Sequence, residues 1–407
     1  MAFTSLINDV LKRVNEDYVV KLLREMIRIP SVCMARQVKE ITEFVLNELK
    51  SYGLKVRVET ERGLEWERPN VIGVIRGLEG KPRLTYAAHT DTVPPYDREK
   101  WLVDPFSGTI VDGKIYGRGA ADAKGSLAAM MAAAKAIADS GVELKGDLVV
   151  VAWYGDEWPE AFTGSNWFNG LSYIGHNRLV TSEYAVLGEP YDLKICPAAR
   201  GRVWFYFTVR GKATHSATGK GINAILKAIK LVDVLYKELK LGEDPLLGRD
   251  TINVGVMNCG TQPNIVPDLC EVKFDIRFGR HLSTSRVIEG VKELVEKLKR
   301  EDPEFMVDMT IPERREPASF PEDGELVKSI KNAGRLAGID LQLGGAVSFG
   351  DILDWRDKMG LKEAVLFGPG KTEMAHAINE HVEIRDLVMA TKVLAVTPLI
   401  LLGTREK

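Results

Sequence analysis

The sequence predicts an α/β protein in which a smaller α+β unit interrupts a larger domain. From Ser5 to about Cys196, apolar strand candidates alternate with helix candidates, which is the order of βαβ units. Between residues 198 and 311 the order becomes β-α-β-β-α-β, which is typical of a ferredoxin-like fold. We therefore expect a discontinuous domain of residues 1–197 and 312–407, with residues 198–311 inserted into it.

The elements of the larger domain are predicted from short apolar runs and from helical periodicity. Four apolar runs of strand length predict buried strands. Three longer segments predict helices, of which the last contains Lys392 and Pro398 and is therefore a core helix rather than a membrane span. The strand candidates are Leu84 to Ala88, Leu148 to Tyr154, Tyr184 to Leu187 and Ala364 to Phe367, and the helix candidates are Leu11 to Ile29, Ser126 to Ser140 and Leu387 to Leu402.

The elements of the inserted unit are predicted from alternating and amphipathic patterns. Arg202 to Arg210 alternates in the manner of a strand, and Ala224 to Leu239 has the period of an amphipathic helix. The remaining candidates are the strands Thr251 to Met257, Glu271 to Arg277 and Phe305 to Thr310, and the helix Ser285 to Arg300.

Composition limits the function classes. With 407 residues, 45% of them hydrophobic, the chain can form one large core and a second domain. A net charge of −2 gives no argument for a nucleic-acid partner. Cys33, Cys196, Cys259 and Cys270 lie far apart without a CxxC pair, so we expect reduced, mostly buried thiols. We recognise no targeting or membrane segment and expect a cytoplasmic protein without nucleic-acid or membrane partners.

Imidazole and carboxylate groups follow the predicted strands, at the edge of the sheet where ligands bind in open α/β folds. A single such residue is usually a loop cap, but a series of them favours a metal site. Mixed His and carboxylate ligation suits Zn²⁺, and a carboxylate able to bridge suggests two ions. In chain order the groups are His89, Asp122 on a glycine-rich turn, Asp156 with Glu157, Glu189 and His376.

Two sequence blocks connect these groups to a known family. His89-Thr90-Asp91-Thr92-Val93-Pro94 and Gly117-Arg118-Gly119-Ala120-Ala121-Asp122-Ala123-Lys124-Gly125 resemble the blocks of the M20 metallopeptidases and deacylases. That group includes acetylornithine deacetylase, succinyl-diaminopimelate desuccinylase, aminoacylase-1 and the glutamate carboxypeptidases. The resemblance extends from Ile29 to Glu380. It implies a zinc-peptidase-like catalytic domain with a mixed sheet, and an inserted lid domain through which two copies form a homodimer.

The resemblance also implies the metal ligands. His89 and Glu189 would bind one Zn²⁺, His376 and Glu157 a second, and Asp122 would bridge the two, with Co²⁺ or Mn²⁺ as possible substitutes. It further implies a cis peptide bond after Asp122. Asp91 lies two residues after His89, on the same side of an extended chain, and is predicted to orient the imidazole.

The identity of the general base has two interpretations. The family usually has Asp-Glu-Glu where this chain has Gly155-Asp156-Glu157-Trp158. Either Asp156 is a shortened base and Glu157 a ligand, or Glu157 is the base and Trp158 stands at the ligand position. We favour the first interpretation, because an indole offers no lone pair to a metal.

Several further positions are candidates for catalysis or substrate binding. His215, in Lys212-Ala213-Thr214-His215-Ser216, matches a histidine that reaches the other subunit's site and would stabilise an oxyanion. Arg277 matches an arginine that binds a substrate carboxylate, the alternative being a salt bridge to a neighbour on the sheet. Asn264 matches a block that contacts substrate in the family, and Ser348-Phe349-Gly350-Asp351 resembles a block near the family's site, with an open role here. Gly368 and Gly370 would form a loop whose backbone can approach a ligand closely.

These observations predict a di-zinc amidohydrolase that cleaves an N-acyl amino acid or a small peptide with a free carboxylate. In the family, Glu at the position of Glu189 is more typical of deacylases and some carboxypeptidases, and Asp of aminopeptidases and dipeptidases, so the resemblance favours a deacylase; a carboxypeptidase or dipeptidase of the same family is the alternative. A non-catalytic descendant that binds metal or peptide is the alternative from another class. Trp101, Trp158 and Trp167 would either line a pocket for a bulky group or pack in the core.

Overall fold

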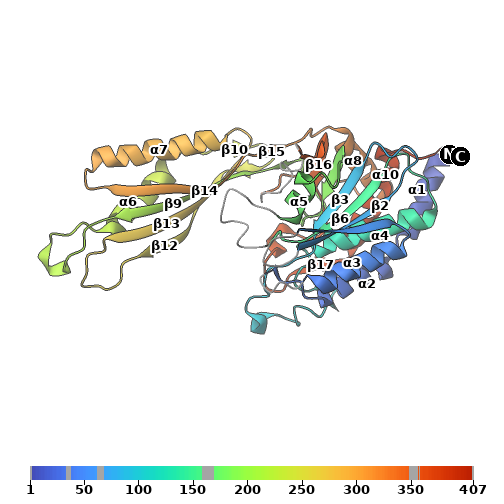
Figure 1. Cartoon of the computed structure of the whole chain (residues 1–407), viewed down its shortest axis with the longest axis horizontal. Coiled ribbons are helices and arrows are strands. Elements are labelled where there is room, and N and C mark those ends of the chain that lie inside the picture. Colours follow the sequence, from blue (N-terminus) through green and yellow to red (C-terminus); the bar gives the residue numbers. More distant parts are fainter. Residues whose placement is uncertain are drawn as a thin grey trace.

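The protein forms two lobes joined side by side into an elongated molecule (Figure 1). The computed structural model describes residues 2–33, 38–61, 68–157, 169–347, 356 and 358–405. The larger lobe contains both ends of the chain and a six-stranded sheet, and the smaller lobe contains a four-stranded sheet covered by two helices.

The sheet of the larger lobe is mixed, with the order β1-β2-β6-β3-β7-β16. The four strands from β6 to β16 are parallel to one another, whereas β2 is antiparallel to both of its neighbours, β6 and β1. Parallel strands buried on both faces require continuous apolar runs, and every residue of β3 and β6 is buried. The strands are β1 (Lys55–Glu61), β2 (Arg68–Ile75), β3 (Leu84–His89), β6 (Leu148–Trp153), β7 (Tyr184–Leu187) and β16 (Glu363–Leu366).

Helices pack on this sheet and form the largest hydrophobic core with it. Members of that core come from α1 (Ala2–Arg13), α2 (Glu16–Arg28), α3 (Lys39–Ser51), α4 (Lys124–Ser140), α8 (Glu325–Ala337) and α10 (Ile384–Leu401). The other face of the sheet packs against α5 (Gly170–His176). The predicted α/β class is confirmed, and so is the buried core helix predicted from Leu387 to Leu402, which α10 contains up to Leu401.

The expected helix from Leu11 to Ile29 is not continuous. It is interrupted after Arg13, and α2 begins at Glu16 because the side chain of Asn15 accepts a hydrogen bond from the backbone N–H of Tyr18. An amide side chain at this position satisfies one of the free donors of the new helix, so it favours a start there over continuation.

Residues 201 to 315 form the smaller lobe with the element order β-α-β-β-α-β. Its sheet has the order β12-β13-β9-β14 and is antiparallel throughout. β14 extends beyond residue 311, and the domain boundaries 198 and 311 remain our proposal. The elements are β9 (Gly201–Arg210), α6 (Ala224–Glu238), β12 (Thr251–Cys259), β13 (Leu269–Phe278), α7 (Thr284–Glu301) and β14 (Met306–Arg315).

Short elements complete the two lobes. They are β4 (Thr109–Val111), β5 (Lys114–Tyr116), β8 (Ala198–Ala199), β10 (Glu243–Asp244), β11 (Gly248–Arg249), β15 (Ala318–Ser319), β17 (His381–Glu383) and the 3₁₀ turns η2 (Arg98–Lys100), η4 (Ser216–Thr218) and η5 (Thr372–Met374). Within the described ranges, no helix combines the length and apolar character needed to cross a membrane.

The expectation of four reduced cysteines is wrong for two of them. Cys259 and Cys270 form a disulfide, whereas Cys33 and Cys196 are buried thiols that take part in no disulfide among the described residues. The two bonded residues are direct partners in the antiparallel pairing of β12 with β13. The bond depends on strand pairing across a hairpin, which a search for CxxC spacing does not detect.

Candidate metal centre

The predicted ligands meet at one edge of the six-stranded sheet. His89 is the last residue of β3, Glu157 follows β6 and Glu189 follows β7. These strands are parallel neighbours, so their carboxyl ends lie together. Asp122 directly precedes the N-terminal region of α4, and the peptide bond between Asp122 and Ala123 is cis, as the family resemblance implies. His376 follows η5, which comes after β16.

The ligands form two groups that share Asp122. One group is His89, Asp122 and Glu189, and the other is Asp122, Glu157 and His376; within each group the candidate ligand atoms lie within 4.8 Å of one another. Asp122 Oδ1 lies 3.0 Å from His89 Nε2, and Asp122 Oδ2 lies 3.4 Å from His376 Nε2. The second imidazole also lies 2.9 Å from Glu157 Oε1. Each oxygen of Asp122 therefore faces a different histidine, as a bridging carboxylate requires.

The charges of these groups depend on one another. Burial raises the pKa of Glu157 to about 7, and the neighbouring carboxylate of Asp122 adds to this effect. Burial also raises the pKa of Glu189 well above its usual range. Burial opposes ionisation of Asp122 as well, but hydrogen bonds from His376 and His89 lower its pKa below the usual range. Hydrogen bonds to Asp122 and Glu157 raise the pKa of His376 to about 10.

This set of donors fits divalent metal ions. Several carboxylates share one buried space, and desolvation disfavours their negative charge unless a cation compensates it. Imidazole nitrogen together with carboxylate oxygen suits Zn²⁺, and each group offers three protein donors. Three protein ligands per ion would leave a position for water or substrate, which is the arrangement of catalytic rather than structural zinc sites.

The side chain of Asp91 contacts residues 155–157 more closely than it contacts His89. We call these residues the base loop, because they include the predicted general base Asp156. The nearest carboxylate oxygen of Asp91 lies 3.8 Å from His89 Nδ1, whereas the main-chain oxygen of Asp91 lies 3.0 Å from it. The carboxylate instead accepts hydrogen bonds from the backbone N–H groups of Gly155 (2.9 Å), Asp156 (3.3 Å) and Glu157 (2.9 Å). The structure therefore differs from our expectation of how Asp91 acts: its side chain orients residues 155–157, and its main chain contacts the imidazole.

Asp156 lies beside the two groups without belonging to either. Burial raises its pKa to about 6, and the nearby carboxylates of Asp91 and Asp122 contribute to the increase. Among the described residues, no hydrogen bond to its carboxylate is present. A carboxylate with these properties suits proton transfer better than ligation. Trp158, which the alternative interpretation places at a ligand position, lies outside the described residues.

Glu380 is a residue of the site that sequence reasoning missed. It is completely buried, and Arg118 donates to its Oε2 at 2.6 Å. Its two oxygens also accept backbone hydrogen bonds from Gly119 (3.0 Å), Ala121 (2.8 Å) and Asp122 (3.0 Å). Glu380 therefore fixes the turn that presents the shared ligand. The available signal was that the family resemblance extends as far as Glu380, which lies four residues after His376.

Lys124 supports the same turn from the other side. Its ammonium is completely buried and donates hydrogen bonds of 2.9 Å to the carbonyl oxygens of Met26 and Ile29. Burial lowers its pKa to about 7, although the carboxylates of Glu380 and Asp91 oppose the shift. Lys124 thus connects the end of α2 to the start of α4, next to Asp122.

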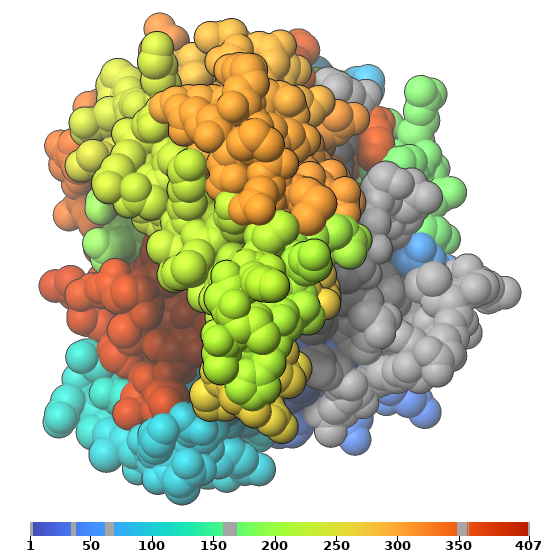
Figure 2. All heavy atoms as spheres, turned by 90° about the vertical axis from the view of Figure 1, so that its left-hand side faces the viewer, coloured from blue at the N-terminus to red at the C-terminus, as the bar shows by residue number. Residues whose placement is uncertain are grey.

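His215 and Asn264 lie together, but in the smaller lobe. The backbone N–H of Ser216 donates to the carbonyl oxygen of Asn264 at 3.0 Å, and His215 is exposed. The η4 loop lies at the end of the small lobe farthest from the large lobe (Figure 1). Viewed from that end, the tip stands in front of the large lobe, beside a hollow bordered by the segments near residues 100 and 375 (Figure 2). The described residues show no bond between His215 and the metal ligands.

Arg277 forms the ion pair that we considered as the alternative to substrate binding. Its Nε lies 2.9 and 3.0 Å from the two carboxylate oxygens of Asp275 on the same strand. Its terminal guanidinium nitrogens donate no hydrogen bond to the described residues. Those nitrogens remain able to bind a further carboxylate.

Gly368 and Gly370 are buried and allow neighbouring segments to approach closely. A side chain at Gly368 would lie 2.5 Å from the carbonyl oxygen of Glu189, and Gly370 has a φ of +87° and would contact Ala121. Both glycines thus hold ligand-bearing segments together.

Trp101 is largely buried, stacked on the guanidinium of Arg118 with 5.2 Å to the ring centroid, which favours packing over a role in a substrate pocket. Trp167 and residues 348–351 lie outside the described residues.

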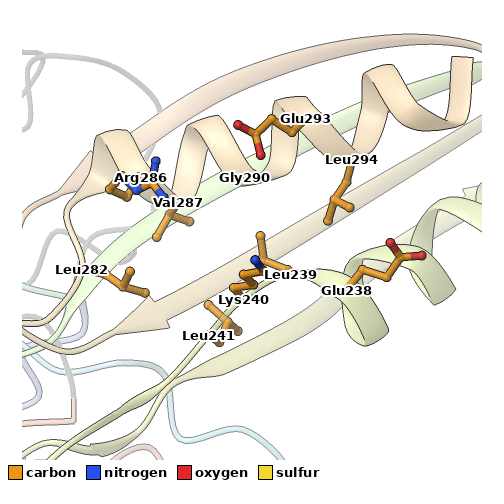
Figure 3. Close-up of a pocket in the computed structure, with 10 residues that line it drawn as sticks. All are labelled: Glu238, Leu239, Lys240, Leu241, Leu282, Arg286, Val287, Gly290, Glu293 and Leu294. Atoms are coloured by element: carbon orange, nitrogen blue, oxygen red, sulfur yellow. The ribbon is translucent and has the colours of Figure 1, made fainter. Parts of the chain in front are cut away.

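A separate pocket lies in the small lobe (Figure 3). It measures about 310 Å³ and is lined by the end of α6 and by α7, including Leu239, Val287 and Leu294. It contains none of the predicted site residues. The metal centre is therefore defined by the convergence of its ligands and not by this pocket.

Comparisons with known proteins show the family and agree with the fold. Residues 85–398 match the model of peptidase family M20/M25/M40. The chain is 31% identical to acetylornithine deacetylase of Myxococcus xanthus, over 81% of this chain and 83% of that protein. It is 28% identical to N-formyl-4-amino-5-aminomethyl-2-methylpyrimidine deformylase of Halalkalibacterium halodurans, over 96% of both chains. The M20 family metallo-carboxypeptidase Sso-CP2 of Sulfolobus solfataricus has a similar structure, with a TM-score of 0.74 and 20% identity, covering 94% of this chain and 99% of that one.

Proposed function

The chain belongs to peptidase family M20/M25/M40, and on this basis we propose that it is a di-zinc amidohydrolase that cleaves an N-acyl amino acid or a small peptide with a free carboxylate. As a family member it is a metal-dependent hydrolase of C–N bonds. The observation that carries the finer proposal is the position of Asp122, whose two carboxylate oxygens face His89 and His376 separately.

The protein's own residues have distinct roles in the proposed reaction. His89 and Glu189 would hold one ion, His376 and Glu157 the other, and Asp122 both. Once bound, the ions would lower the pKa of a water molecule and polarise the carbonyl of the scissile amide. Asp156 would accept the proton of the attacking water and transfer it to the leaving amine. Asp91 and Glu380 would keep the base loop and the Asp122 turn in place through their backbone hydrogen bonds.

We propose that the site is completed by a second copy of the chain, which contributes His215. In a single chain the η4 loop lies away from the large lobe, where a partner could receive it (Figure 1). The small lobe also offers an apolar surface. On α6, Leu226, Ile229 and Tyr236 are 63%, 52% and 48% exposed and follow helical spacing, and β12 is an edge strand. Pairing along α6 and β12 would cover both features.

We propose that the small lobe and the loop that contains Gly368 and Gly370 recognise the substrate. Arg277 would bind the substrate carboxylate with its free terminal nitrogens, Asn264 would contact the substrate beside His215, and Gly368 and Gly370 would form the adjoining wall. The names of the deformylase and the deacetylase favour removal of an acyl group over cleavage of a peptide. A cytoplasmic location stays part of the proposal.

A hydrolysis screen tests the function. Protein loaded separately with Zn²⁺, Co²⁺ and Mn²⁺ is offered N-formyl, N-acetyl and N-succinyl amino acids, dipeptides, and matched amides that lack the free carboxylate. We expect turnover of at least one acyl amino acid and at least tenfold lower kcat/KM for its carboxamide analogue. Cleavage of dipeptides alone would favour the carboxypeptidase or dipeptidase alternative. An intact panel with metal bound would favour the non-catalytic alternative.

A further inference from the structure

A second pocket lies at the edge of the six-stranded sheet opposite the metal centre. It measures about 240 Å³ and is lined by residues of β1, β2 and β6 and by the segment that follows α5. Arg83 directly precedes β3, and Thr181 lies three residues before β7. Since β3 and β6 each have six residues, about 20 Å of strand separate this edge from the metal ligands.

The lining of this pocket combines basic side chains with an apolar floor. Four of its ten residues are arginines, namely Arg57, Arg76, Arg83 and Arg178, and none is acidic. The floor is apolar and includes Ile72, Val74, Val149 and Val180. A solvated surface normally intersperses charges of both signs, so a concave site with one sign of charge is a candidate for binding an ion of the other sign.

The guanidinium groups are held in place mainly by shared or neutral acceptors. Nη1 of Arg76 and Nη2 of Arg83 donate to the same oxygen of buried Asp147, at 2.7 and 3.1 Å. Nη1 of Arg83 also donates to the carbonyl oxygen of Thr181 at 2.9 Å. Arg57 donates to the carbonyl oxygen of Leu179 and pairs with Glu59. The carboxylates of Asp147 and Glu59 therefore pair with three arginines. These bonds hold the guanidinium groups in position before a ligand binds.

Arg178 adds a fourth cation without an acidic neighbour. It is exposed, and within the described ranges it forms neither an ion pair nor a side-chain hydrogen bond. Arg83 also retains an unused donor, since its buried Nε has no hydrogen-bond partner. The pocket thus keeps both positive charge and donor capacity that the protein itself does not use.

We propose that this pocket binds a small phosphorylated molecule, with its phosphoryl group on the arginines and an apolar or planar part on the floor. Planar guanidinium groups donate paired hydrogen bonds to phosphoryl oxygens, and several of them together match a dianion better than a single charge. The volume admits a small molecule and not a folded partner. This site is independent of the proposed hydrolase reaction.

Calorimetric titration with phenyl phosphate tests the proposal, because this probe has both a dianionic group and a planar ring. The titration is carried out on the metal-loaded protein at constant ionic strength. Benzoate has the ring with one carboxylate charge, and inorganic phosphate lacks the ring. We expect phenyl phosphate to bind at one site per chain that Arg178→Ala weakens about tenfold and Arg76→Gln/Arg178→Ala weakens further. Benzoate and phosphate should each bind more weakly than phenyl phosphate.

The control separates this pocket from the metal centre, which also attracts anions. Arg335→Ala removes an exposed arginine of α8 and should leave the affinity unchanged. Equal affinity in the wild-type protein and in Arg178→Ala would overturn the proposal, because the phosphate would then be bound elsewhere. Equal binding of benzoate and phenyl phosphate would also overturn it, since it would show no preference for a dianion. Arg178→Ala alone decides the matter if the double variant fails to fold, because the Arg178 side chain makes no hydrogen bond or ion pair with the described residues, and its backbone hydrogen bond to Gly175 does not involve the side chain.

Discussion

The predicted site residues of the two lobes differ in their burial and in their contacts. In the large lobe, the ligands come from five separate parts of the chain, and in each group their ligand atoms lie within 4.8 Å of one another. His89 is completely buried and His376 is about half exposed, and carboxylates that bind the backbone support the set, as Glu380 does for Asp122. In the small lobe, His215 is exposed and Arg277 is paired with its own neighbour, and neither contacts the metal ligands among the described residues.

This difference indicates which parts of the site one chain can assemble by itself. Parallel neighbouring strands bring their carboxyl ends together, so the metal centre follows directly from the fold. The small lobe has its own core and sheet, and nothing in its internal packing directs η4 towards the ligands. The contribution that we propose for it would therefore require another copy of the chain or a change in the angle between the lobes.

The largest effect is expected at the residue that both ion groups share. Asp122→Ala removes a donor from each group and leaves His89 and His376 without their common partner. We expect the metal content to fall from about two ions to less than one per chain and kcat/KM to fall by about 10⁴-fold or more. Metal analysis after dialysis and the best substrate of the screen provide the measurements. A variant that retains two ions would show that Asp122 does not bridge.

The next largest effect distinguishes the general base, Asp156, from the neighbouring metal ligand, Glu157. Asp156→Ala should lower kcat by about 10²- to 10⁴-fold while the metal content stays near two per chain, because Asp156 belongs to neither ligand group. Glu157→Ala should lose one ion. Metal analysis of the two variants side by side decides between the interpretations of this segment: loss of an ion from Asp156→Ala, with retention in Glu157→Ala, would reverse the two roles.

Sequence alone was sufficient for the residues whose position depends on a strand. His89, Glu157 and Glu189 directly end or follow apolar runs, and such runs fix where the chain reaches the sheet edge. Sequence was insufficient where position depends on long-range pairing. The hydrogen bonds of Glu380 reach back across more than 250 residues, and the Cys259–Cys270 disulfide depends on the register of a hairpin. The contact of the Asp91 carboxylate with residues 155–157 is of the same kind.

Mixing of variants tests whether the small lobe acts on a partner. His215→Ala should lower kcat about 100-fold with the metal content unchanged, because only an oxyanion donor is lost. When His215→Ala and Asp122→Ala chains are unfolded together and refolded, each mixed dimer should contain one intact site. Random pairing then restores about a quarter of the wild-type activity. No recovery, with mixed dimers verified by mass, would mean that each chain uses its own His215.

The supporting carboxylates of the two lobes provide a matched pair for a smaller effect. Glu380→Gln replaces an acceptor of Arg118 and Gly119 with an amide and should weaken metal binding about 10- to 100-fold. Glu313→Gln disturbs another buried pair, with Arg202 in the small lobe at 3.1 Å. Both changes should lower the free energy of unfolding, but only Glu380→Gln should change the metal Kd. Equal metal Kd values for the two variants would reduce Glu380 to a residue needed for stability alone.

The smallest effect concerns the junction between the lobes, where Arg280 contacts both Asp244 and Glu322. Burial opposes ionisation of Asp244, but hydrogen bonds from Arg280 and from the backbone of Leu246 keep its pKa below the usual range. A carboxyl group with a lowered folded-state pKa stabilises the fold above its unfolded pKa of about 3.9 and loses this contribution as the pH falls towards the folded value. Acid should therefore loosen the junction while the sheet of the large lobe stays protected.

Hydrogen exchange at pH 7 and pH 3 measures this effect, with the exchange rates of residues 244–250 and 279–282 compared with those of β3. Asp244→Asn should lower the free energy of unfolding by about 1–3 kcal/mol at pH 7. The loss should be smaller at pH 3, because the carboxyl group of the unfolded wild-type chain binds a proton there and part of the stabilisation by the ionised form is already gone. Asp308→Asn is the control, because its pair with Arg210 is more than half exposed on both sides and should contribute little. Uniform acid loosening of both lobes would show that the junction is not the weaker region and that the two lobes unfold as one unit.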